Sequence, residues 1–169
     1  MKQNRDGRGG GGGPRDRGGF GGGAAPSAEA DAAFKEELKK IDLASPSPEL
    51  FDTTAERIAG MLGRDENTNK ASQIRRFYDE VTRYSDRLRR PDDREMLRKQ
   101  LPFIRMINAK VAYAASRESG RGKLVDRNFQ EFMRTCLGQV NSIETLQMFR
   151  LLFEAVIGFW PKEQARRYP

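Results

Sequence analysis

Apolar residues recur every three or four positions along most of the chain, which is the spacing of one face of an α-helix. A first short helix is predicted after Ser27, because serine is favoured as a helix cap. Its apolar face consists of Phe34, Leu38 and Ile41. A second helix is predicted from Pro48, in "SPSPEL", to about Gly63, because proline is favoured at the start of a helix and glycine at its end.

Two longer helices are predicted in the middle of the chain. The first begins in "NKASQIRRFYDEV" at Asn69 and ends before Pro91, which a helix interior does not tolerate. Its apolar face consists of Ile74, Phe77, Tyr78, Val81, Tyr84 and Leu88. The second continues to about Arg117, and Pro102 is expected to kink it or to mark a restart, because proline lacks an amide hydrogen.

The last two predicted helices are the most apolar. Residues 125–140 have a broad apolar face, and residues 142–157 are apolar nearly all round, so we expect the latter to form the central, most buried helix. No segment alternates between apolar and polar residues with a period of two, so no sheet is predicted. The predicted fold is therefore all-α, a compact bundle of about five helices over residues 27–169.

The N-terminal residues have a different composition. Residues 1–26 contain eleven glycines and almost nothing that a core could bury, so we predict a disordered glycine/arginine-rich tail. Arginines and one phenylalanine among glycines resemble RNA-associated segments, which bind single strands loosely by charge and stacking. A tail that only keeps the protein soluble fits the same composition equally well.

Composition argues against most enzyme chemistry. The chain has no histidine, the commonest general base and metal ligand, and Cys136 is its only cysteine. Cys136 lies on an apolar helix face, where an inert core thiol is expected. "SGRGKL" lacks the spacing of a phosphate-binding loop, and the adjacent Asp92 and Asp93 suit a helix start rather than a catalytic pair. We therefore expect no enzyme activity, no metal site and no cofactor.

Length and hydropathy bound the class of protein. A chain of 169 residues suits one domain. Its apolar runs are far shorter than the ~18 residues of a membrane helix, and its N-terminus has no apolar core like that of a secretory signal. A soluble cytoplasmic protein with no membrane partner is predicted.

Charge is spread unevenly along the chain. The net charge is +7, and residues 69–117 alone have thirteen basic and six acidic side chains, whereas residues 27–68 have five basic and ten acidic ones. In the first long helix, polar residues lie along one stripe, flanked by Lys70 and Arg75. The stripe consists of Asn69, Gln73, Arg76, Arg83 and Arg87. The local positive excess favours contact with the phosphates of a polyanion, without sequence preference, over a merely solvated helix face.

Four stretches together resemble a known family. They are "NKASQIRRFYDEV", "LPFIRMINAKVAYAASR", "VDRNFQEFM" and "FRLLFEAVIGFW". In this order, over about residues 51–160, they are similar to the small subunit of type III-A CRISPR effector complexes, the Csm small-subunit family. The resemblance implies a non-catalytic, all-helical protein present in several copies, which stack as a filament along the guide RNA–target RNA duplex beside other Csm subunits.

The resemblance also implies which residues hold the RNA backbone. Within the matched stretches these are Lys70, Gln73, Arg75, Arg76, Arg83, Arg105, Lys110 and Arg117. The acidic segment 27–68 is expected to dock on a basic flank of the next copy, as the head-to-tail contacts of an open filament require.

Three other functions remain open from the residues. The main alternative is a helical protein–protein adaptor without direct RNA contact, with Trp160 or Tyr84 as its anchor. A DNA-binding regulator lacks a clear helix-turn-helix spacing. An enzyme lacks a recognisable set of catalytic residues.

Overall fold

The computed structural model describes residues 28–65, 67–90, 93–119 and 122–160. The predicted tail over residues 1–26, the predicted cap Ser27 and the predicted helix end Pro91 lie outside the described residues. The elements are α1 (Ala28–Lys39), the short 3-10 helix η1 (Pro48–Phe51), α2 (Thr53–Leu62), α3 (Ala71–Arg87), α4 (Arg94–Arg105), α5 (Ile107–Ser116), β1 (Glu118–Ser119), β2 (Gly122–Lys123), α6 (Arg127–Gln139) and α7 (Ile143–Gly158). The all-α class is confirmed.

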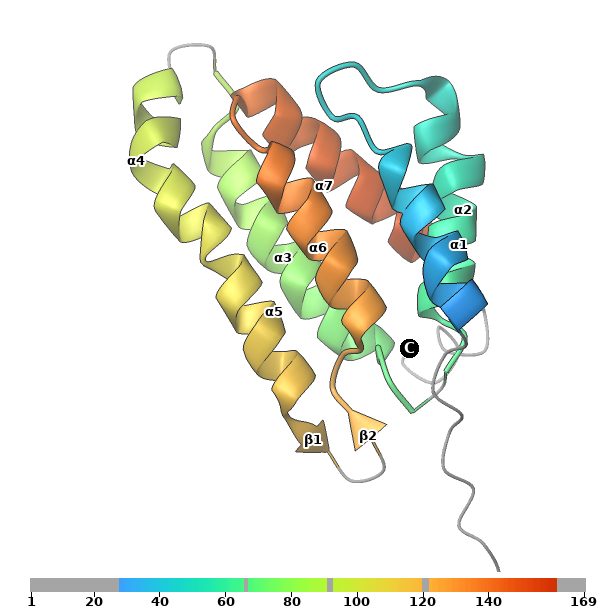
Figure 1. Ribbon diagram of the computed structural model, residues 1–169. Helices are drawn as coiled ribbons and strands as arrows, with labels where there is room; N and C mark the ends of the chain where they lie inside the picture. Colours follow the sequence, from blue (N-terminus) through green and yellow to red (C-terminus); the bar gives the residue numbers. More distant parts are fainter. Residues whose placement is uncertain (1–27, 66, 91–92, 120–121, 161–169) are drawn as a thin grey trace, which may run out of the picture.

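The helices form two layers (Figure 1). One layer consists of α4 and α5, then α6, then α1, and the other consists of α3, α7 and α2. The layers meet where α6 packs on α7 and α1 packs on α2. The segment made of α4 and α5 therefore lies at one edge of the bundle, and α1 and α2 lie at the opposite edge.

The core is an aromatic cluster between the two layers. Phe129 and Phe132 of α6 and Phe149 and Phe153 of α7 are fully buried, with ring centroids 5.6–6.4 Å apart. Helix α7 contacts α2, α3 and α6, as expected of the most buried helix. It is not buried all round, however. Helix α7 is the middle helix of its layer, so one of its sides lies at the protein surface, where Leu151 is 42% exposed.

Two predicted helices are interrupted. The helix predicted from Pro48 is divided by Asp52, whose backbone (φ −120°, ψ −99°) lies outside the helical region, so only α2 is regular and it ends before Gly63 as predicted. The interruption expected at Pro102 lies instead at Met106, whose amide donates to the Pro102 carbonyl at 3.0 Å. Met106 keeps a right-handed helical conformation, so α5 continues in nearly the direction of α4 (Figure 1).

A short hairpin follows α5. Residues Glu118 and Ser119 pair antiparallel with Lys123 and Gly122, where the sequence pattern predicted no strand. The expectation of no sheet is wrong at this ladder of two residues per strand, which is too short to produce a visible alternation of apolar and polar residues.

Asn69 joins three elements from inside the protein. Its side chain is fully buried, its Nδ2 donates to the Leu62 carbonyl at 2.9 Å, and its Oδ1 accepts from the Asp126 amide at 2.8 Å. Its φ of 49° is left-handed, a conformation that asparagine tolerates better than most residues. The prediction that Asn69 belongs to the exposed stripe is therefore wrong, because α3 begins only at Ala71.

Replacing Asn69 should destabilise the whole bundle. In Asn69→Ala, the Leu62 carbonyl and the Asp126 amide lose their partners, and alanine is strained at a left-handed φ, so we expect a loss of about 2–3 kcal/mol in the free energy of unfolding. Urea denaturation followed by circular dichroism measures it. Asn67→Ala, at an exposed position of the same loop, is the control. Equal stabilities of the two variants would contradict the role assigned to Asn69.

Candidate nucleic-acid interface

Helix α3 has one buried and one exposed side. Ile74, Phe77 and Val81 face the core, whereas Arg76 and Arg83 are exposed. Two arginines seven residues apart lie on the same face of a helix, about 10 Å apart along its axis. The separation of apolar and basic residues predicted from the helical period is therefore present in the structure.

The charges of Arg76 and Arg83 are not used inside the protein. Within the part of the chain that the structure describes, neither side chain makes a hydrogen bond or an ion pair. A guanidinium group presents five N–H donors in a planar fork that matches the oxygen atoms of a phosphate. These two residues are consequently the best-placed anion ligands among the eight candidates.

Lys70 and Gln73 lie at the start of the same helix. Lys70 is exposed directly before α3, and Gln73 is half-buried in its first turn. The first turn of α3 contains no acidic residue, so the partial positive charge at the helix N-terminus is not offset there and adds to the charge of Lys70. Lys70 therefore extends the basic face of α3 toward its N-terminus, and Gln73 adds a neutral hydrogen-bond donor there.

Arg75 lies to one side of this face. It is exposed and lines a small hollow of about 20 Å³ together with Ile157 and Trp160 at the end of α7. In the sequence, Arg75 flanks the polar stripe of this helix. The structure places its side chain beside apolar residues of α7, away from the line joining Arg76 and Arg83.

The three remaining candidates all have partners inside the protein. They are Arg105 of α4, Lys110 of α5 and Arg117, which directly follows α5. The Lys110 ammonium group forms an ion pair with Glu80, which links α5 to α3. Arg105 donates from Nη2 to the Val140 carbonyl at 3.4 Å, so it reaches α6 on the other flank. The Arg117 guanidinium carbon lies 5.5 Å from the centroid of the Tyr113 ring.

Large apolar residues at the surface were not predicted as a site. Of the exposed large apolar side chains that the structure describes, most lie on α4 and α5 or between them: Met96, Phe103, Met106 and Tyr113. The two anchors suggested for an adaptor do not belong to this exposed set. Trp160 is only 6% exposed, and Tyr84 is half-buried against the core. The signal for the exposed set was its own spacing of seven and three residues.

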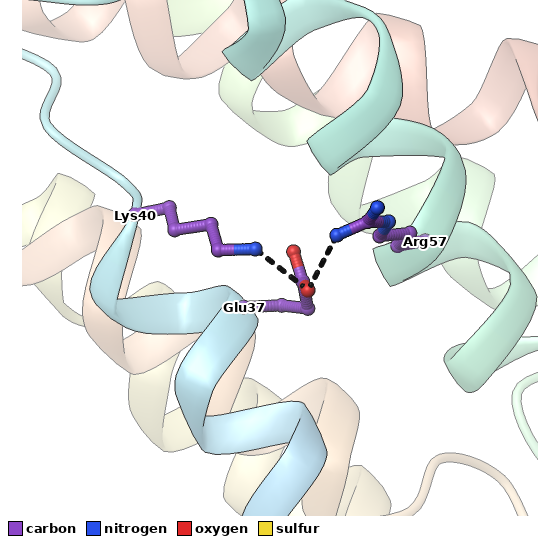
Figure 2. A network of polar contacts seen from close by, with 3 residues as sticks. All are labelled: Glu37, Lys40 and Arg57. Carbon is purple, nitrogen blue, oxygen red and sulfur yellow. Dashed lines mark hydrogen bonds and ion pairs between the residues drawn. The ribbon is translucent and has the colours of Figure 1, made fainter.

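The acidic segment is partly used inside the fold. Glu37 of α1 is buried, and its Oε1 accepts from Lys40 at 2.8 Å and from Arg57 of α2 at 3.3 Å (Figure 2). Burial raises the pKa of Glu37, but the hydrogen bonds and charges of Lys40 and Arg57 outweigh it, so the pKa lies below its ordinary value. Glu49 of η1, Asp52 directly before α2 and Glu56 of α2 remain exposed.

The remaining candidate chemistry is structural. Cys136 is fully buried, and burial raises the pKa of its thiol well above the ordinary value, as an inert core thiol requires. No group of three or more metal-ligating side chains occurs among the residues that the structure describes. In the same residues, no helix has the length and hydropathy that a membrane span needs.

An open hollow of about 520 Å³ lies between α1 and α6, and none of the eight candidates lines it.

The comparisons with known proteins give one match. Residues 45–164, more than half of the chain, match the family model described as Csm2 Type III-A. This range contains residues 51–160, over which the four stretches resemble the Csm small-subunit family. No curated protein and no solved structure matches the chain.

The Glu37 contacts predict a pH-dependent contribution to stability. Because the pKa of Glu37 is lowered in the folded protein, its contribution is present above the unfolded-state pKa of about 4.3 and is lost as pH falls through the folded-state pKa. We expect Glu37→Gln to cost about 1 kcal/mol at pH 7 and less at pH 3, measured by urea denaturation. Glu36→Gln, which removes an exposed carboxylate of the same helix, is the control. A cost independent of pH would contradict the ionic role of Glu37.

Proposed function

Since this chain belongs to the Csm2 Type III-A family, the small subunit of the type III-A Csm complex, we propose that it binds RNA there through the phosphate backbone. The observation that carries this proposal is the pair of exposed arginines Arg76 and Arg83, whose charges have no partner among the described residues. Basic side chains spaced along one helix face suit the repeat of a phosphate backbone, and phosphate contacts carry no sequence information. In this proposal the sequence is read by pairing between guide RNA and target RNA.

The proposed RNA contacts fall into two ranks. The first consists of Lys70, Gln73, Arg75, Arg76 and Arg83, on or next to α3. The second consists of Arg105, Lys110 and Arg117, which would have to share or exchange an internal partner to bind RNA. For Arg117 and Lys110, giving up the internal partner costs little free energy, because exposed contacts of this kind stabilise a protein only slightly.

In this proposal the subunit takes no catalytic step. It binds no cofactor or metal, acts in the cytoplasm, and stacks in several copies along the guide RNA–target RNA duplex. The support for stacking is the charge distribution: residues 27–68, which include the exposed Glu49, Asp52 and Glu56, have five basic and ten acidic side chains, whereas residues 69–117 have thirteen basic and six acidic ones. Opposite charges on different parts of the surface favour a head-to-tail contact with a basic flank of the next copy, which repeats without closing.

The alternative is an adaptor that contacts other subunits without touching RNA. The exposed apolar residues on α4 and α5, such as Phe103 and Tyr113, favour this alternative for that part of the surface. The two functions differ in how they depend on salt, since apolar contacts are not weakened as phosphate contacts are. They also differ in location, because the RNA contacts are proposed on α3 and the adaptor contacts on α4 and α5.

Neutralising the exposed arginines tests RNA binding. Arg76→Ala and Arg83→Ala should each weaken binding to unrelated RNA sequences to a similar extent and lower the slope of log affinity against log salt concentration by about 0.7–0.9. Fluorescence anisotropy with labelled RNA at several salt concentrations measures both. Arg98→Ala removes the same charge from an exposed position on α4 and should change neither. Wild-type binding by both α3 variants would favour the adaptor.

Neutralising the acidic edge tests stacking. The triple variant Glu49→Gln, Asp52→Asn and Glu56→Gln should reduce the number of copies per complex, as measured by native mass spectrometry. The control removes three exposed carboxylates elsewhere: Glu95→Gln, Glu144→Gln and Glu154→Gln. Unchanged assembly of the first variant would refute the proposed contact.

A further inference from the structure

A regular row of exposed residues follows the outer side of α4 and α5. It consists of Met96, Lys99, Phe103, Met106, Lys110, Tyr113 and Arg117, and all seven are exposed. The intervals between them alternate between three and four residues, the repeat of positions a and d in a coiled coil. We call this row the α4–α5 stripe.

The stripe is continuous although α4 and α5 are separate helices. The buried residues Leu97, Ile104 and Val111 are spaced by seven on both sides of the interruption at Met106, so the buried face keeps its register. The exposed face, which is fixed relative to the buried one, keeps its register too. A straight partner of about twenty residues could therefore contact the whole length of the stripe.

The apolar members of the stripe are unusually accessible. Met96 is 47% exposed, Phe103 and Met106 are each 53% exposed, and Tyr113 is 63% exposed. Contiguous exposed apolar residues are rare on monomeric proteins and mark contacts with other molecules. Seven-residue spacing along a helix indicates the kind of contact, because a second helix inserts its side chains between such positions.

The charges beside the stripe indicate the chemistry of that second helix. Between residues 94 and 117 the chain has six basic side chains and one acidic side chain, Glu95. Three of the basic residues, Lys99, Lys110 and Arg117, belong to the stripe itself. A helix with carboxylates on either side of its apolar row would complement them, whereas a basic helix would be repelled.

None of the helices that the structure describes would supply such a partner from a second copy of this chain. Two stripes facing each other would bring like charges together. The acidic edge formed by α1 and α2 presents no large exposed apolar side chain among the described residues. Leu151 and Phe159, on and next to α7, are exposed but number only two, against four apolar residues in the stripe.

We propose that the α4–α5 stripe binds an amphipathic helix of a different subunit, with an apolar row flanked by aspartates or glutamates. This inference rests on membership of a multi-subunit complex and is independent of the proposed RNA contacts on α3. The two functions use adjoining helices but different residues, except for Lys110 and Arg117.

Photocrosslinking in the assembled complex tests the occupant of the stripe. p-Benzoylphenylalanine is placed at Phe103, at Tyr113 or, as the control, at Arg98, which is exposed on the opposite flank of α4. Mass spectrometry should identify, for the first two positions, one helical segment of another subunit with acidic residues beside its apolar row. Crosslinks to RNA, crosslinks to a second copy of this chain, no crosslinks at all, or the same products from Arg98 would each overturn the proposal.

A charge introduced into the stripe separates this proposal from RNA binding. Phe103→Glu should reduce incorporation of the subunit into the complex at least tenfold, while the isolated protein keeps its RNA affinity and salt dependence. Ala109→Glu, an equal change at an exposed position outside the stripe, is the control. Normal incorporation of Phe103→Glu would refute the docking surface. Weaker RNA binding by Phe103→Glu than by Ala109→Glu would assign the stripe to RNA instead.

Discussion

The rotation of α3 about its own axis is fixed by two aromatic contacts, and the positions of its charged residues follow from them. The Phe77 ring lies 5.6 Å from that of Phe129 in α6, and the Tyr78 ring meets Phe153 of α7 edge-on at 5.7 Å. Successive residues of a helix point about 100° apart. Because Phe77 is buried and Tyr78 packs half-buried against the core, Arg76 faces outward, and the surface that we assign to RNA is a consequence of core packing.

Much of the fold could be predicted because helices are encoded locally. The 3.6-residue period identified the core faces of α3, α6 and α7, and glycine marked the end of α2. The long-range polar contacts could not be predicted. Asn69 reaches Asp126, and Gln139 bonds to Ile41 and Leu43 at 2.8 and 2.9 Å across nearly a hundred residues. No local pattern distinguishes such an amide from one that faces solvent.

The candidate site shows the same limit at the level of single side chains. Periodicity correctly placed Arg76 and Arg83 on an exposed face, because that depends only on the helix they belong to. It could not show that Arg105 is held by the Val140 carbonyl or that Lys110 is paired with Glu80, because those partners come from other elements. A charge counted from the sequence is therefore an upper limit on the charge available to a ligand.

The ion pair between Lys110 and Glu80 separates the two surfaces that we propose as binding sites. It links the basic face of α3 to α5, which carries the exposed Tyr113, and it uses a positive charge that would otherwise extend the proposed phosphate-binding face toward Tyr113. Charges without an internal partner remain on α3, where a polyanion can approach them at low desolvation cost. Exposed apolar area is concentrated on α4 and α5, where its removal from water drives binding. The RNA contact that we propose depends on charge and the protein contact that we propose depends mainly on apolar area, so salt should weaken the first more than the second.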